Sequence, residues 1–202
     1  MFALVEDGSI TKYFSGNSGF TLNGNQYPKQ VFTLWTKSER EAIGIYEVVW
    51  DNTNKKDEAW YINTNPSYAF ANDKVTASYG SATAKAHADT LFTSDDEDNG
   101  LGTEGEVKDE GLKTVLIRDV KKQAAGELQN TDWYITRKAD AGTAVPSAIT
   151  NHRAAVRTKC AEMETSITNA SNTAALETLY TYTRQEDGSN TRPLGELPTL
   201  ES

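Results

Sequence analysis

Residues 94–111 read SDDEDNGLGTEGEVKDEG, and this stretch divides the chain into two halves of different character. It contains eight acidic residues, four glycines and one basic residue, Lys108, so its net charge is −7 of the chain's −9. Like charges repel one another and glycine adds backbone freedom, so such a stretch favours a solvated conformation. We therefore predict an acidic, glycine-rich linker at 94–111 and a domain boundary beside it.

The part before the linker, residues 1–93, has the pattern of a small β-rich domain. Asp7-Gly8 and Asn23-Gly24 are dipeptides that accept positive φ and favour tight turns between strands. Strands are predicted at 2–5, 9–13, 19–22, 31–34, 45–50, 59–64 and 74–79.

One short helix interrupts these strands. Thr36 and Glu39 have the spacing of a capping box, in which each side chain bonds the other residue's backbone N–H. Gly44 lies where a left-handed residue ends such a helix. The N-terminal domain therefore carries a single short helix between two strands.

The part after the linker changes to helical periodicity. Apolar residues over 112–128 recur at i, i+3, i+4 and i+8, which predicts an amphipathic helix. A second helix is expected to begin at Thr131 as N-cap and to end at Gly142. A third follows Pro146 and carries a narrow apolar seam at Ile149, Val156, Cys160, Met163 and Ile167.

A short last helix is predicted over 172–182, before a proline-containing end. The predicted fold class is α+β. It combines a β-rich N-terminal domain at 1–93, the acidic hinge at 94–111, a C-terminal helical hairpin within a helical domain at 112–183, and an extended tail at 184–202.

Composition excludes several function classes. A net charge of −9 and a pI near 4.8 disfavour a nucleic-acid binder, which needs clustered Lys and Arg. No run reaches the ~18–20 apolar residues of a membrane span.

The one cysteine, Cys160, lies eight residues from His152 in a single helix, about 12 Å along its axis. That separation is too large for a Cys–His pair. Because the chain has only two histidines and no group of polar residues that converges on one site, we expect no catalytic residue, no cofactor and no enzyme.

The acidic segment also resembles a calcium loop of the EF-hand type. Ligand positions one, three, five and twelve are filled by Asp95, Glu97, Asn99 and Glu106, with Gly100 at position six. Against calcium, the third ligand is a Glu, position eight is Gly102, and no second loop pairs with the first. A solvated linker is the preferred interpretation, and a calcium-binding module at 95–106 is the weaker alternative.

Six residues are candidates for contact with a partner protein. Trp133 is either a core anchor or a binding platform. Arg137, Arg153 and Arg157 either form a solvated basic face or grip carboxylates. The tail residues Leu194 and Leu197 either fold back on the body or dock on another chain.

The stretch at 127–138 reads ELQNTDWYITRK, and it is followed in order by Gly142, Pro146, Ile149, His152, Arg153 and Arg157. This order resembles the C-terminal region of phage tail assembly chaperones and tail-fibre assembly proteins. The opening MFALV at 1–5 and the passage at 39–48, which ends in GIYEV, resemble the N-terminal half of the same proteins. Together these stretches cover about half of the chain.

The resemblance implies a non-enzymatic viral protein that binds tail or tail-fibre subunits and assists their assembly in the host cytoplasm. The alternative is a permanent structural component of the tail, baseplate or tail fibre, retained in the virion. Neither a nucleic acid nor a membrane is expected as a partner.

Overall fold

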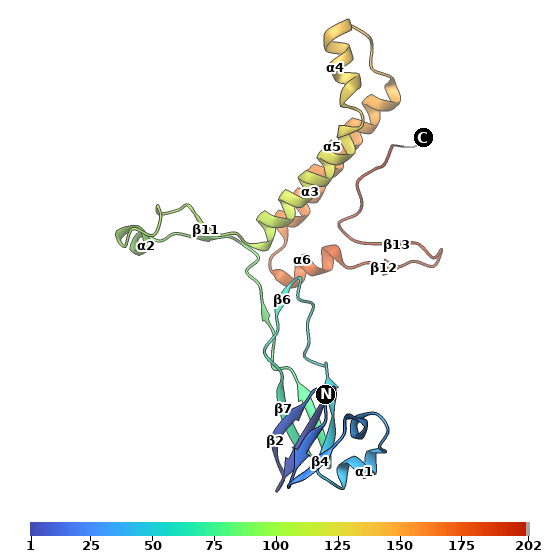
Figure 1. Ribbon diagram of the computed structural model, residues 1–202. Coiled ribbons are helices and arrows are strands. Elements are labelled where there is room, and N and C mark those ends of the chain that lie inside the picture. Colours follow the sequence, from blue (N-terminus) through green and yellow to red (C-terminus); the bar gives the residue numbers. More distant parts are fainter. Residues whose placement is uncertain (201–202) are drawn as a thin grey trace. The chain divides into compact units, whose positions relative to one another are not determined.

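A computed structural model describes residues 1–200 and divides the chain into two compact units, residues 1–83 and the residues from Ala84 onward (Figure 1). The first unit is built mainly of strands and the second mainly of helices, so the chain has the predicted α+β class. The division lies ten residues before the expected boundary at 93/94, because residues 84–93 bond to later parts of the chain: the Lys85 carbonyl accepts from the Thr173 hydroxyl, and the Asp89 carboxylate accepts from the Gly111 N–H.

The first unit is organised around a five-stranded sheet with the order β2-β1-β5-β8-β7. Its central strand β5 pairs antiparallel with β1 and parallel with β8, and the outer pairs are antiparallel. The strands are β1 (Phe2–Glu6), β2 (Ser9–Phe14), β5 (Ile45–Asp51), β7 (Ser67–Ala71) and β8 (Lys74–Ser78).

Each face of this sheet carries a cluster of buried residues. Because side chains alternate along a strand, Phe2 and Leu4 point to one face while Ala3 points to the other. The first face forms a cluster with Phe32 and Ile45. The second face carries a cluster of small side chains, Ala3, Val48, Val75 and Ala77.

The turn signals locate most of these strands. Asp7 and Gly8 have φ of 49° and 76°, and Asn23 and Gly24 have φ of 49° and 77°, as predicted. The second turn joins β3 (Phe20–Leu22) to β4 (Asn25–Tyr27).

Two predicted strands are wrong in extent or type. Residues 31–34 do not form a strand, because η1 (Lys29–Phe32) is a 3₁₀ helix that buries its last two residues. The strand expected at 59–64 is only β6 (Tyr61–Ile62), and β7 was missed. The capping box of Thr36 and Glu39 is confirmed, and it starts α1 (Lys37–Glu41).

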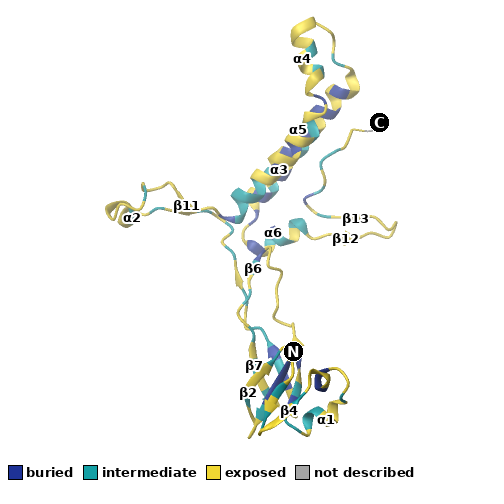
Figure 2. Ribbon diagram, in the orientation of Figure 1, coloured by how far each residue is buried: buried dark blue, intermediate teal, exposed yellow. Residues whose placement is uncertain are grey.

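The second unit contains the predicted helical hairpin. Its helices are α3 (Leu112–Gln129), α4 (Asp132–Ala141), α5 (Ser147–Asn169) and α6 (Thr173–Tyr180). α3 and α5 lie side by side, and Figure 2 shows buried residues along their facing sides. Every residue of the predicted α5 seam is buried, so that prediction is confirmed.

The acidic segment has local structure that the sequence did not predict, although nearly all of its residues are exposed to solvent. α2 (Ser94–Asp98) lies between β10 (Thr90–Leu91) and β11 (Val107–Asp109), which pair antiparallel. We call residues 90–109 the acidic arm. A capping box between Thr93 and Asp96, and an ion pair of 2.8 Å between Asp96 and Lys108, offset part of the charge repulsion.

The C-terminal tail is only partly extended. β12 (Thr183–Arg184) and β13 (Asn190–Thr191) form a short hairpin after α6. The remaining strand of the chain, β9 (Thr83–Ala84), is not part of the tail and lies before the acidic arm. Leu194 is 2% exposed, and its backbone N–H donates to the Leu179 carbonyl at 3.0 Å. Of the two expectations for Leu194, the structure shows the fold-back. The last two tail residues lie outside the described residues.

Candidate functional site

The end of the helical hairpin, where α3 gives way to α4, is the best-defined exposed site. We call residues 131–141 the α4 tip. The α5 residue Arg153 fixes its position: Nη1 donates to the Leu128 carbonyl at 2.9 Å and to the Thr131 hydroxyl at 2.6 Å. The same nitrogen forms an ion pair with the Asp132 carboxylate at 2.8 Å. One buried guanidinium therefore joins the end of α3 and the start of α4 to α5.

Thr131 takes part in this arrangement differently from the prediction. It occupies the N-cap position of α4, but its side chain makes no capping bond. Its hydroxyl, in a residue only 1% exposed, donates instead to the Leu128 carbonyl at 2.8 Å. The hydroxyl thus adds a donor to the Leu128 carbonyl, which also accepts from Arg153 and from the Thr131 backbone N–H, and it accepts a hydrogen bond from Arg153 in turn.

Arg153 is a positioning residue and not a contact surface. The residue is 7% exposed, and its Nε is buried without a hydrogen-bond partner. A buried charge without its partners is costly, so this geometry is kept only while Thr131 and Asp132 stay in place.

The exposed surface of α4 presents Trp133 and Arg137 on one side of the helix and Ile135 on the opposite side, because residues two apart on a helix point in nearly opposite directions. Trp133 is 52% exposed and Ile135 is 43% exposed, and none of the ten residues of α4 is buried. The Arg137 guanidinium lies 4.6 Å from the centroid of the Trp133 ring and 5.5 Å from that of Tyr134. The rings of Trp133 and Tyr134 are 3.9 Å apart. Trp133 is therefore not a core anchor but part of an exposed aromatic–arginine cluster.

The other predicted contact residues lie elsewhere. Arg157 is exposed on α5, and its Nη1 donates to the Arg153 carbonyl at 3.5 Å. Leu194 is buried, and Leu197 is half-buried. Of the six candidates, the structure brings the exposed Trp133 and the half-buried Arg137 together and bonds Arg153 to Thr131 and Asp132 at the start of the same helix.

The weaker calcium alternative gains no support from the acidic arm. Asp95 and Glu97 lie on the helix α2 and not on a loop, and Glu97 already accepts from the Glu104 backbone N–H at 3.1 Å. Across residues 1–200, no group of three or more His, Cys, Asp or Glu side chains is placed to hold a metal ion. The Lys108 ammonium, with the Thr93 backbone N–H, lowers the pKa of Asp96 to about 2.

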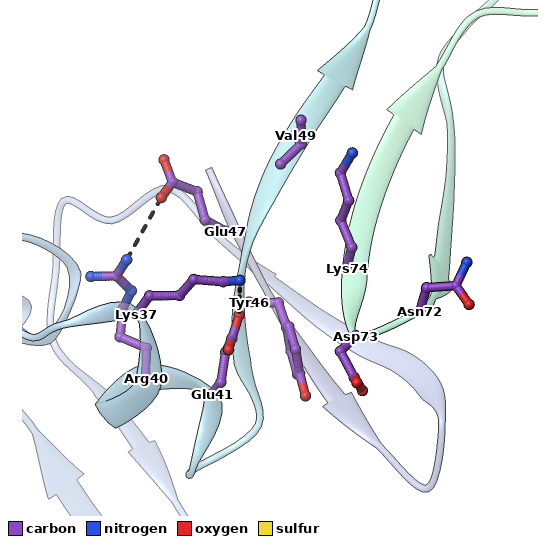
Figure 3. Close-up of a pocket in the computed structure, with 9 residues that line it drawn as sticks. All are labelled: Lys37, Arg40, Glu41, Tyr46, Glu47, Val49, Asn72, Asp73 and Lys74. Carbon is purple, nitrogen blue, oxygen red and sulfur yellow. Dashed lines mark ion pairs between the residues drawn. The ribbon is translucent and has the colours of Figure 1, made fainter.

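The first unit contains a pocket of about 410 Å³ that sequence reasoning missed (Figure 3). Lys37, Arg40 and Glu41 come from α1 and its neighbourhood, and Tyr46, Glu47, Val49, Asn72, Asp73 and Lys74 come from β5 and the β7–β8 hairpin. Two ion pairs already engage part of its charge, Lys37 with Glu41 at 3.5 Å and Arg40 with Glu47 at 3.6 Å.

The chemistry of this pocket is that of a mixed-charge surface. Three cations and three carboxylates line it, and its nine lining residues include no Ser, Cys or His that could act as a nucleophile. The turn signal at Asn72-Asp73 and the capping box locate the flanking elements in the sequence. No local signal shows that these elements meet.

Comparisons with family models, with curated proteins and with solved structures found no match to this chain. Among the helices of the described residues, none combines the length and apolar character needed to span a membrane.

Proposed function

We propose that this chain is a non-enzymatic protein of a tailed phage that binds tail or tail-fibre subunits through the α4 tip and assists their assembly. The observation that carries the proposal is the exposed Trp133 ring with the Arg137 guanidinium against it, on a helix held at its first residue by the buried Arg153. The order Thr-Asp-Trp, Arg, Pro, Arg in this region, which resembles tail-fibre assembly proteins, supports the same partner class.

The residue types on this face suit protein recognition. Tryptophan and arginine are the residues that most often dominate the binding energy of protein interfaces. Half of the Trp133 side chain remains to be buried by a partner, and its burial removes apolar area from water at about 25 cal/mol per Å². Because α4 is already held in place, less conformational entropy is lost on binding.

The chemistry of the face defines its partner. An apolar patch accepts Trp133, and a carboxylate beside that patch pairs with Arg137. Unassembled subunits expose such patches before their neighbours arrive. While the α4 tip covers this patch, the subunits do not associate prematurely. Contacts between the assembled subunits then replace the α4 tip.

Co-purification tests the proposal. Each tail and tail-fibre subunit of the genome that encodes this chain is co-expressed with the tagged chain, and one or more is expected to co-purify. Trp133→Ala with Ile135→Ala removes both exposed apolar side chains of α4 while preserving helix propensity, and it is expected to abolish co-purification. Leu34→Ala, at a residue 76% exposed in the first unit, is the matched control.

Two outcomes refute the proposal. Either no tail or tail-fibre subunit co-purifies with the intact chain, or the double variant retains its subunit as well as the Leu34→Ala control does. Mass spectrometry of purified particles then separates two roles. A transient assembly protein is absent from particles, whereas a permanent tail component is present in stoichiometric amount.

A further inference from the structure

A row of aromatic side chains lies on the five-stranded sheet of the first unit and has no part in the proposed function. Its consecutive rings are in contact, with centroid distances of 4.9 Å from Tyr13 to Tyr68, 6.3 Å from Tyr68 to Trp50 and 6.0 Å from Trp50 to Tyr79. We call these four residues the aromatic row. The Lys55 ammonium lies 5.6 Å from the centroid of the Tyr79 ring.

The strand register places the aromatic row on one face of the sheet. Trp50 of β5 and Tyr68 of β7 both pair with Ala77 of β8, so the three side chains point to the same face. The buried cluster of this face contains only alanine and valine, and the larger rings therefore extend beyond it. Tyr13 and Trp50 are 48% and 43% exposed, so the row is open to a ligand.

Each ring of the aromatic row carries a polar group that is free to bond a ligand. Among the described residues, the three tyrosine hydroxyls and the Trp50 indole N–H make no hydrogen bond. Such groups find hydrogen-bond partners when they become buried. A ligand that covers the row must therefore offer an apolar side to the ring faces and hydrogen-bonding groups along its edge.

A hollow of about 280 Å³ adjoins the aromatic row, because Tyr13 also lines it. Its lining combines the Ser15 and Ser18 hydroxyls with two phenylalanine rings. Among the eight lining residues, Lys12 alone is charged, and its ammonium lies 5.3 Å from the Phe14 ring. The hollow thus repeats the chemistry of the row, with aromatic faces beside hydroxyl groups.

Charge disfavours a nucleic acid as the ligand of the row. Residues 1–83 contain seven basic and nine acidic residues, a net charge of −2. Bases that stack on aromatic side chains also need a track of cations along their phosphates. An uncharged ligand suits this nearly neutral surface better.

The contacts between the rings disfavour a proline-rich peptide. Such a peptide lays its prolines into grooves between aromatic side chains. The rings of the aromatic row touch one another at 4.9–6.3 Å and leave no groove between neighbours. The row is therefore a continuous platform, on which a ligand stacks from above.

We propose that the aromatic row binds a neutral oligosaccharide of hexose units. A pyranose ring presents C–H groups on one face and hydroxyls around its edge, which matches an aromatic face with a free polar group beside it. Successive sugars of one chain stack on successive rings of the row, and a sugar at the Tyr13 end bonds the Ser15 and Ser18 hydroxyls. The site is independent of the α4 tip.

A glycan array that carries neutral hexose chains and sialylated chains, probed with the purified full-length chain, tests the proposal. Binding to at least one neutral hexose oligosaccharide is expected, and titration calorimetry with that oligosaccharide then measures its affinity. Trp50→Ala and Tyr13→Ala are each expected to weaken the affinity about tenfold or more, because each removes one stacking face. Leu34→Ala in the same unit and Trp133→Ala on α4 also remove exposed apolar side chains. Both are controls and are expected to leave the affinity unchanged.

Four results overturn the proposal. They are the absence of binding to every neutral oligosaccharide, binding confined to sialylated chains, and a Trp50→Ala chain that circular dichroism shows folded and that binds as tightly as the Leu34→Ala control. The fourth is Trp50-dependent binding of a proline-rich peptide by a chain that binds no glycan. Each of these results leaves the proposed function intact, because subunit binding is tested separately by Trp133→Ala with Ile135→Ala.

Discussion

Replacing Arg153 by alanine is expected to destabilise the helical unit by about 3 kcal/mol. Its hydrogen bonds to the Leu128 carbonyl and the Thr131 hydroxyl are buried and charge-assisted, and such bonds contribute about 1.5–3 kcal/mol each. The three side-chain methylenes add about 2 kcal/mol when buried.

Two effects reduce this sum. The Asp132 side chain is 59% exposed and regains water when Arg153 is removed, so its ion pair contributes little. The buried Arg153 Nε has no partner, and its removal recovers about 1–3 kcal/mol. The balance is about 2–7 kcal/mol, and we take about 3 kcal/mol, the lower end of the range for losing one partner of a buried charged network.

Urea unfolding followed by far-UV circular dichroism measures this effect, because most helical residues lie in the second unit. With an m-value of about 2 kcal/mol/M, the midpoint is expected to fall by about 1.5 M. Arg157→Ala, one turn further along α5 at an exposed position, is the matched control and is expected to stay within about 0.5 kcal/mol. An Arg153→Ala midpoint equal to that of the control would refute the assigned role of Arg153.

The remaining predictions concern the tail, the arm and the first unit. Leu194→Ala is expected to cost about 2–4 kcal/mol in urea unfolding and Leu197→Ala clearly less, because only the first side chain is fully buried; equal costs would contradict the docked tail. The pKa of Asp96, about 2, lies below its ordinary value of 3.8, so its contribution to arm stability is present above pH 3.8 and is lost as pH falls toward 2. Amide exchange of the arm is expected to rise over that range, and Asp96→Asn but not Asp98→Asn removes the dependence. Gly44→Ala is expected to cost about 2 kcal/mol in the first unit, since φ is +78° and the added Cβ meets a backbone carbonyl at 2.7 Å; an unchanged melting temperature argues against this geometry. Millimolar calcium is expected to give neither heat nor a change in ellipticity, and saturable heat would restore the calcium alternative.

Local signals in the sequence predicted the elements that local chemistry decides. The Thr36–Glu39 capping box, the Asp7-Gly8 turn and the left-handed Gly142 act within a few residues, and all three are confirmed. The α5 seam was also predictable, because its 3–4 spacing leaves one apolar stripe that must face another helix.

Long-range contacts explain what the sequence did not show. The acidic segment was expected to repel itself, but Lys108 pairs with Asp96 across twelve residues and closes the arm. Likewise, the separation of 22 residues between Arg153 and Thr131 concealed their hydrogen bond, so Arg153 was predicted as a contact residue although it is buried. The pocket of the first unit depends on a crossover in sheet order that no turn signal encodes.

Hydrogen exchange of the chain, alone and bound to a co-purified tail or tail-fibre subunit, tests the recognition surface most directly. The account predicts that the subunit slows exchange of the backbone amides of α4 and of the α3–α4 junction around Thr131. Unchanged exchange throughout α4, with protection confined to the first unit, would contradict the claim that the α4 tip holds the partner.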